Sequence, residues 1–391
     1  MTEQQKEHYF DWAATSPSDS EILKEALSET LENWGNPSSI HSAGKEARNI
    51  LESARNKCAK ALGVNANTLY FTSGGTESDH IPLLSTLNRP GKPHVLFSSI
   101  EHPAVREMAE ELKKCGISVE QIPSDKNGII QPETVVSLLK PETVFVAVMA
   151  VNNETGAIQP VYEIADAIVK ATEGRRKPKF HIDCVQAAGK LPIDLNKKGI
   201  DSAAFSAHKI CGPRGIGLLY SKEPFEPFLR GGGQEKGIRS GTENVYGAVA
   251  FSKCLEKYVI SAQNKKMEER FEAQKQYCSN FVKSLSGIEG CKIIPDFRIE
   301  NPDFYSPWIV QAAFKNIPGQ VMLRALDAEG FYISTGSACS SRKNNRPVLE
   351  AMNISKNESE NAVRFSFGSE TTEKAMQELF EKVAEIAKKF N

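Results

Sequence analysis

Residues 202–215 read SAAFSAHKICGPRG, an apolar segment followed at once by a polar turn that contains Lys209 and two glycines. The first four residues predict a buried strand, and Lys209 comes just after its end. Earlier in the chain, other short apolar segments also end in polar residues and alternate with helical patterns. Strands that alternate with helices predict an α/β protein with a mainly parallel sheet covered on both faces.

The predicted strands and helices extend from residue 46 to residue 220. Strands are expected at residues 69–72, 94–98, 143–151, 179–182, 202–205 and 217–220. Helices are expected at residues 46–62, 104–115 and 161–172. The run 144–151 is apolar without alternation, which is typical of a strand that is buried on both faces.

The pattern changes after residue 244. The rest of the chain predicts a long helical region at 245–285, strands near 308–314 and 362–367, and a final helix at 372–390. We therefore expect a large α/β domain at 13–250 and a small α+β domain formed by 1–12 and 251–391. The length of 391 residues exceeds an ordinary single core, which also favours two domains.

The composition excludes several classes of function. A net charge of -1 favours neither nucleic acid nor a membrane surface as the main partner. The first eight residues are polar, and the longest apolar run is too short to cross a bilayer, so we expect a cytoplasmic protein without a signal peptide. The eight cysteines have no zinc-site spacing, so no metal is expected, and a reducing compartment is favoured.

Five of the predicted strands end in groups of polar residues. These groups are 73–78 (SGGTES), 101–102 (EH), 152–156 (NNETG), 183–186 (DCVQ) and 206–209 (SAHK). Ligands of open parallel sheets bind beyond the carboxyl ends of the strands. Five such strand ends therefore predict one shared pocket.

Four of these groups suit parts of an aldehyde cofactor that carries a phosphate. The backbone N–H groups of 73–76 could hold the phosphate, and Lys209 could form a Schiff base with the aldehyde. Asp183 could pair with a protonated pyridine nitrogen, and His102 could cover the ring and shuttle protons, since an ordinary histidine titrates near neutrality. The alternatives are a plain strand-to-helix turn, a surface lysine and two helix caps. Each alternative is stronger alone, but one cofactor accounts for all four groups together.

Beyond these groups, the chain resembles a known family, the cysteine desulfurases of the NifS/IscS type. The resemblance rests on SGGTES, EHPAV, VNNETG, HIDCVQAAGK, SAHKICGPRGIGLLY, GGGQEKGIRSGTENV and STGSACSS, which occur in the family's order. It extends from about residue 9 to residue 375. These enzymes are class V, fold-type I proteins that use pyridoxal 5'-phosphate (PLP). The resemblance implies a large domain with a mainly parallel seven-stranded sheet between helices, and a smaller α+β domain.

The resemblance also implies roles for individual residues. Lys209 would hold the cofactor, Asp183 would face its pyridine nitrogen, and His102 would stack on its ring. The phenolic oxygen would be contacted by Gln186 and Asn153. The phosphate would be held by Gly75, Thr76, Ser206, His208 and, from a second subunit, Thr242, which implies a homodimer. Arg364 would bind the substrate carboxylate, a task that suits its planar fork, and Asn36 would assist.

Cys339 is the predicted sulfur acceptor. It lies in a segment rich in Ser, Gly and Asn without apolar periodicity, which indicates a loop. Arg342, Lys343 and Arg346 are close in sequence and could favour its thiolate. The family reaction converts L-cysteine to L-alanine and leaves a persulfide on this cysteine. The sulfur would then pass to an acceptor protein, an iron–sulfur scaffold or a sulfur relay protein.

Some features leave alternatives open. Ser369 and Glu370 stand where the family pattern has an arginine and an aromatic residue, and the loop after Cys339 is about one residue shorter. Both differences concern acceptor docking. A selenocysteine lyase, another class V aminotransferase-like enzyme and a non-catalytic protein on a retained PLP fold are the competing interpretations. The pathway that receives the sulfur, iron–sulfur assembly, tRNA thiolation or another, is not indicated.

Overall fold

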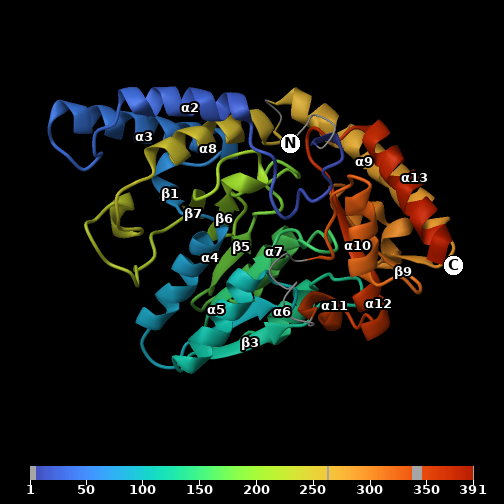
Figure 1. Ribbon diagram of the computed structural model, residues 1–391. Coiled ribbons are helices and arrows are strands. Elements are labelled where there is room, and N and C mark those ends of the chain that lie inside the picture. The colour runs from blue at the N-terminus through green and yellow to red at the C-terminus, as the bar shows by residue number, and fades with distance from the viewer. Residues whose placement is uncertain (1–5, 262–263, 337–345, 391) are drawn as a thin grey trace.

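The computed structural model describes residues 6–261, 264–336 and 346–390, which form two sheets with their covering helices (Figure 1). The large sheet has seven strands in the order β1-β7-β6-β5-β4-β2-β3. Its strands are β1 Leu69–Thr72, β2 His94–Ser98, β3 Ser118–Ile122, β4 Thr143–Met149, β5 Lys179–Asp183, β6 Ser202–Ser206 and β7 Gly217–Ser221. β7 pairs antiparallel with β1 and β6, and all other strand pairs are parallel. The predicted fold class, including the seven strands, is confirmed.

Helices cover both faces of this sheet because successive strand residues point to opposite sides. In β2 and β4, Leu96 and Val146 belong to the core under α3 (Ser42–Leu62), α7 (Val161–Ala171) and α8 (Val245–Tyr258). Their neighbours Phe97 and Phe145 pack on the other face, against α4 (Gly75–Leu84) and α5 (Pro103–Lys114). The helices cover the two faces of the sheet. The carboxyl ends of the parallel strands all lie along one edge of it.

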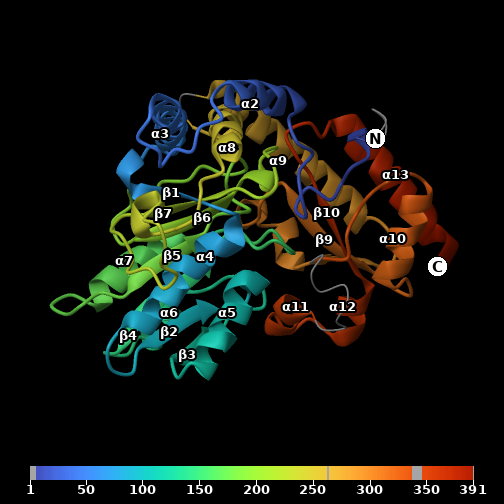
Figure 2. The ribbon, with the colours of Figure 1, turned by 60° about the vertical axis from the view of Figure 1, so that its left-hand side comes forward.

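The second sheet is small and antiparallel, in the order β10-β9-β8. Its strands are β8 Cys291–Ile294, β9 Ile309–Phe314 and β10 Ala362–Ser366. Around it lie α9 Lys265–Ser286, α10 Gly319–Ala328, α11 Pro347–Ala351, α12 Lys356–Asn361 and α13 Glu373–Phe390 (Figure 2). The remaining helices are α2 Ser20–Glu32, which packs on α8, and the short α6 Pro132–Ser137, which packs on α7.

The N-terminal segment joins the two parts of the molecule. The Phe10 N–H donates to the Tyr332 carbonyl, and the Phe10 carbonyl accepts from the Ser366 N–H, both at 2.8 Å. A few residues later, the Ser16 N–H donates to the carbonyl of His208 on the large-sheet side, also at 2.8 Å. Residues 10–16 therefore lie between the small sheet and the end of β6.

Some elements differ from the sequence-based expectations. The edge strand β3 and the strand β8 were missed, and the expected strand 143–151 ends at Met149. The expected helical region 245–285 is two helices, because the backbone is extended at Val259. The domain division near residue 250 stays a prediction, and α8 continues past it to Tyr258. Within the described residues, no helix has the length and apolar character needed to cross a membrane.

Candidate active site

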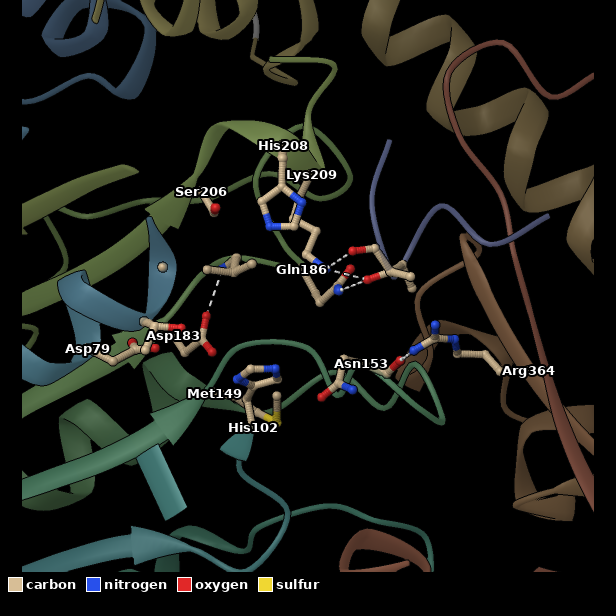
Figure 3. Close-up of a pocket in the computed structure, with 15 residues that line it drawn as sticks. Asp79, His102, Met149, Asn153, Asp183, Gln186, Ser206, His208, Lys209 and Arg364 are labelled. Carbon is tan, nitrogen blue, oxygen red and sulfur yellow. Dashed lines mark hydrogen bonds between the residues drawn. The ribbon is translucent and has the colours of Figure 1, made fainter. Parts of the chain in front are cut away.

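A cavity of about 240 Å³ lies at the carboxyl ends of β1, β2, β4, β5 and β6 (Figure 3). Ten of the thirteen residues predicted for the site line it. They are Gly75, Thr76, His102, Asn153, Asp183, Gln186, Ser206, His208, Lys209 and Arg364. The structure therefore brings together residues from five strand ends and from the small sheet in one pocket.

Lys209 enters this pocket from a single 3-10 turn, Ala207–Lys209, directly after β6. Its Nζ donates to the Ala13 carbonyl at 2.6 Å and to the Ala14 carbonyl at 2.7 Å. The Ala13 carbonyl also accepts from Nε2 of Gln186 at 2.8 Å. The N-terminal segment thus holds the side chain of Lys209 at the pocket wall, in contrast to the alternative of a solvated surface lysine.

The phosphate end of the predicted site is formed by the start of α4 and the end of β6. Gly75 opens α4 and lies against Val185, so that a Cβ at this position would come within 2.7 Å of Val185 Cγ2. Thr76 is exposed at the pocket mouth, whereas Ser206 is buried. A glycine is required here by close packing, and the backbone N–H groups of the first helical turn remain available for an anion.

Asp183 lies at the pocket floor, and its Oδ1 accepts from the Val185 N–H at 2.8 Å. Burial raises its pKa to about 8, and the neighbouring carboxyl of Asp79 contributes in the same direction. Asp79 in turn pairs with Nε2 of His181 at 3.1 Å. A cationic group that faces Asp183 would favour its carboxylate form, which is what a protonated pyridine nitrogen provides.

His102 has two roles at once. It caps α5, where its Nδ1 accepts from the Ala104 N–H at 3.1 Å, and it lines the pocket opposite Gln186 (Figure 3). The neutral ring therefore carries its hydrogen on Nε2. Burial and the nearby Lys209 lower its pKa to about 4. The expectation of a histidine that titrates near neutrality is wrong, since burial disfavours the charged ring.

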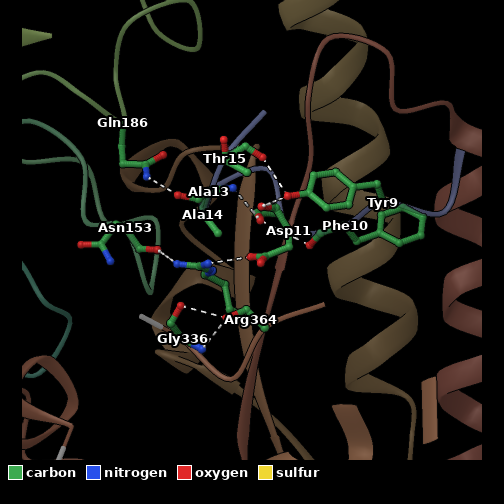
Figure 4. A network of polar contacts seen from close by, with 12 residues as sticks. Tyr9, Phe10, Asp11, Ala13, Ala14, Thr15, Asn153, Gln186, Gly336 and Arg364 are labelled. Carbon is green, nitrogen blue, oxygen red and sulfur yellow. Dashed lines mark hydrogen bonds and ion pairs between the residues drawn. The ribbon is translucent and has the colours of Figure 1, made fainter. Parts of the chain in front are cut away.

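Arg364 reaches the pocket from β10 and is 1% exposed. Its Nη2 pairs with Asp11 Oδ1 at 2.8 Å, and its Nη1 donates to the Asn153 carbonyl at 2.7 Å (Figure 4). Nε of Arg364 and Oδ1 of Asn153 are buried and have no hydrogen-bond partner among the described residues. Both atoms are therefore available to a polar ligand in the pocket.

The two ends of the segment that contains Cys339 lie beside this arginine. Ser334 pairs with Arg364 in a short antiparallel bridge, and a Cβ on Gly336 would come within 2.5 Å of Arg346 Nη2. That guanidinium also contacts Glu154 Oε2 at 3.4 Å. Cys339 itself lies outside the described residues, together with Arg342 and Lys343.

Two predicted residues lie away from the cavity. Asn36 is exposed in the α2–α3 connection, where its Oδ1 accepts from the Ser38 N–H at 2.9 Å. Thr242 is also exposed, at the end of the glycine-rich segment before α8. Neither residue lines the pocket of its own chain.

Other lining residues were not anticipated. Asp79 and Met149 line the floor, and Ala13 and Ala14 line the side that accepts from Lys209. Asp79 could have been found, because it lies four residues after Gly75 and thus on the same side of a helix. Alanine carbonyls give no signal in a sequence.

The donors and acceptors of the pocket fit PLP. A lysine, a buried carboxyl on the floor and a glycine that opens a helix occur together. The cofactor's aldehyde, pyridine nitrogen and phosphate each require one such group.

Comparison with known proteins agrees with this chemistry. The profile of the aminotransferase class-V family matches residues 8–379. A cysteine desulfurase IscS of Dictyoglomus turgidum is 34% identical over 98% of this chain and 95% of its own length. A solved NifS-like protein, 34% identical, superimposes with a TM-score of 0.87 and covers 97% of this chain and 99% of its own. A structure described as SspA in complex with cysteine, 27% identical, has a TM-score of 0.78 and covers 93% and 100%.

Proposed function

We propose that this chain, which belongs to the aminotransferase class-V family and is a PLP-dependent cysteine desulfurase of the NifS/IscS type, uses Lys209 and Cys339 as its two reactive side chains. L-cysteine is the substrate, and L-alanine is the product. The convergence of Lys209, Asp183, His102 and Arg364 on one cavity is the observation that carries the proposal.

In this proposal the residues that line the pocket would hold PLP. Lys209 would bind the aldehyde, Asp183 would face the pyridine nitrogen, and His102 would cover the ring. Gln186 and Asn153 would face the phenolic oxygen, and Gly75, Thr76, Ser206 and His208 would hold the phosphate. When bound, PLP supplies an electron sink for the pair left by removal of the Cα proton.

The chain's own residues perform the remaining chemistry. Arg364 holds the substrate carboxylate with its fork, and Lys209 takes the Cα proton. The Cys339 thiolate attacks the substrate sulfur, and an S–S bond forms as the Cβ–S bond breaks. The electron pair of the broken bond goes to Cβ, which is protonated on the way to alanine, and the sulfur remains on Cys339 as a persulfide. Cys339 is the third residue after Gly336, which limits their separation to about 11 Å, and Gly336 follows Ser334, which pairs with Arg364.

A homodimer completes the site in this proposal, with Thr242 of one subunit at the phosphate of the other. Large apolar side chains stand exposed near these segments: Trp34 is 80% exposed, Ile40 89% and Leu229 69%. Such side chains are frequent at interfaces. Asn36 lies between Trp34 and Ile40, so a role at the partner's site stays compatible with its exposure. Sedimentation of an active monomer would contradict this arrangement.

The persulfide is passed on to an acceptor protein, an iron–sulfur scaffold or a sulfur relay protein. We also infer a cytoplasmic location, since a persulfide carrier needs a reducing compartment. The seven cysteines within the described residues are all unpaired.

The test is to incubate the purified protein with L-cysteine and to quantify alanine and protein-bound persulfide. Cys339→Ala should lose both products, whereas Cys115→Ala, which changes an exposed cysteine far from the pocket lining, should keep them. If Cys339→Ala forms alanine and sulfide at the parent rate, the selenocysteine lyase interpretation moves ahead. Parallel reactions with selenocysteine then distinguish the two.

A further inference from the structure

A second lysine lies directly behind the pocket. Lys190 is only 5% exposed, and its Nζ donates to Oε1 of Gln186 at 2.6 Å. Within the described residues, the ammonium group of Lys190 makes no other hydrogen bond. The backbone carbonyl of Lys190 accepts from Nε1 of Trp308 at 2.7 Å, which fixes the chain at this position.

The contact with Lys190 and the contact of Gln186 with the Ala13 carbonyl fix the same orientation of the Gln186 amide. A lysine ammonium has donors and no acceptor, so it can only face the amide oxygen. The NH₂ group of Gln186 is then turned to the other side, where it donates to the Ala13 carbonyl at 2.8 Å beside the pocket. Without such a partner, the two orientations of an amide are close in energy and are set by the remaining contacts.

We propose that Lys190 is a positioning residue, which turns the Gln186 amide so that an N–H group, and not the carbonyl, faces the phenolic oxygen of PLP. The proposal rests on the placement of Gln186 under the proposed function. A phenolate oxygen accepts hydrogen bonds, so only the NH₂ orientation stabilises it. An inverted amide would place two oxygens against each other.

The position is an expensive one for an ammonium group. Burial lowers the pKa of Lys190 to about 7, and the positive charges of Lys209 and Arg364 act in the same direction. An apolar side chain of similar shape, such as methionine, would fill the space without this cost. The hydrogen bond to Gln186 therefore explains a lysine at this position better than packing does.

The experiment uses the full-length PLP-bound protein and two readouts other than turnover. These are the pH midpoint of the visible absorbance band of bound PLP, and the dissociation constant of PLP. The variants are Lys190→Met, Gln186→Leu and the double variant. Loss of the hydrogen bond to the phenolic oxygen should raise the midpoint by roughly one pH unit and weaken PLP binding about tenfold. Because Lys190 acts through Gln186, the double variant should shift no further than Gln186→Leu alone.

Two further variants separate positioning from packing. Trp308→Phe removes the hydrogen bond to the Lys190 carbonyl but keeps the ammonium, so it should lower stability and leave the midpoint unchanged. Lys190→Leu, which has no hydrogen-bond donor and no charge to bury, should reproduce the shift of Lys190→Met, and it replaces that variant if Lys190→Met does not fold. Three outcomes would overturn this inference and leave the proposed function standing. The midpoint could stay unchanged in the Lys190 variants, Trp308→Phe could shift it as much as they do, or the shifts could add in the double variant. An unchanged midpoint in Gln186→Leu would overturn the placement of Gln186 as well.

Discussion

The two sides of the pocket are built in different ways. The cofactor wall, formed by Gly75, His102, Asp183 and Lys209, stands at the strand ends of one sheet. Pairing within that sheet fixes its geometry, as Asp183 lies opposite Met149 on one side and Ala204 on the other. A sheet ladder therefore positions these residues through backbone pairing.

The substrate wall, formed by residues 11–14, Asn153 and Arg364, is assembled from three distant parts of the chain. Arg364 contacts Asp11 across 353 residues of sequence and Asn153 across 211. Lys209, from the cofactor wall, is bonded to the same N-terminal segment through Ala13 and Ala14. Changes on the cofactor wall should therefore act on PLP and chemistry, and changes on the substrate wall should act on substrate affinity.

The largest effect is expected on the cofactor wall, for Lys209→Ala. General acid–base catalysis contributes about 10²–10⁴-fold, and this variant also loses the covalent link to PLP. Alanine formation from cysteine should fall by at least about 10³-fold. The matched control is Lys179→Ala, at the opposite end of β5, which should keep the parent rate. Equal loss in both variants would mean that the two ends of the sheet are not functionally distinct.

Arg364→Lys tests the substrate wall. Losing a hydrogen bond to a charged group costs about 1.5–3 kcal/mol, which corresponds to a rise in KM of about 10- to 150-fold. The visible band of bound PLP should stay unchanged, because Arg364 touches the N-terminal segment and not the cofactor wall. Arg298→Lys changes another buried arginine, whose partners are the carbonyls of Thr155, Ser306 and Ile309, and should lower stability without raising KM. A change in kcat with constant KM in Arg364→Lys would remove the distinction between the walls.

The difference between the walls also explains what the sequence could predict. The cofactor wall is built at strand ends, and a strand that is buried on both faces gives a clear apolar run. Strands β1 and β2 were therefore predicted with their correct bounds, and the polar residues beyond the strand ends converge as expected. Edge strand β3 was missed, because Ser118, Glu120 and Gln121 interrupt its apolar pattern.

The substrate wall could not be derived from local patterns. The contacts of Ala13 and Ala14 are made by backbone carbonyls, which every residue carries, and Asp11 is one acidic residue among many. Arg364 was predicted through the family resemblance, and an unrelated strand could carry such a residue in a surface ion pair. The pKa of His102 likewise depends on burial, which only the assembled pocket reveals.

Gly75→Ala tests how tightly the cofactor wall is packed. The added Cβ would come within 2.7 Å of Val185 Cγ2 and 3.5 Å of Ser206 Cβ. Such overpacking costs about 1–3 kcal/mol, so PLP should bind about 5- to 150-fold more weakly. The double variant Gly75→Ala with Val185→Ala removes the clashing methyl group and should recover most of the affinity. If it does not, the glycine is needed for its backbone and not for the space beside Val185.

The smallest effect concerns the pH dependence of stability, through His102. Its pKa is lowered from 6.5 to about 4 in the folded protein, so between these values the unfolded chain takes up a proton that the folded one does not. The contribution of this group to stability is therefore fully present above pH 6.5 and is lost as the pH falls toward 4, by about 2 kcal/mol between pH 7 and pH 5.

His102→Gln keeps an acceptor for the Ala104 N–H and has no such proton uptake. Urea unfolding of the PLP-free full-length protein at both pH values should show a smaller acid loss in this variant. The control is His41→Gln, because His41 also caps a helix, α3, but is exposed to solvent. Between pH 7 and pH 5, this variant should lose as much stability as the parent protein. Equal acid losses in His102→Gln and the parent would show that the cofactor wall does not keep this ring out of water.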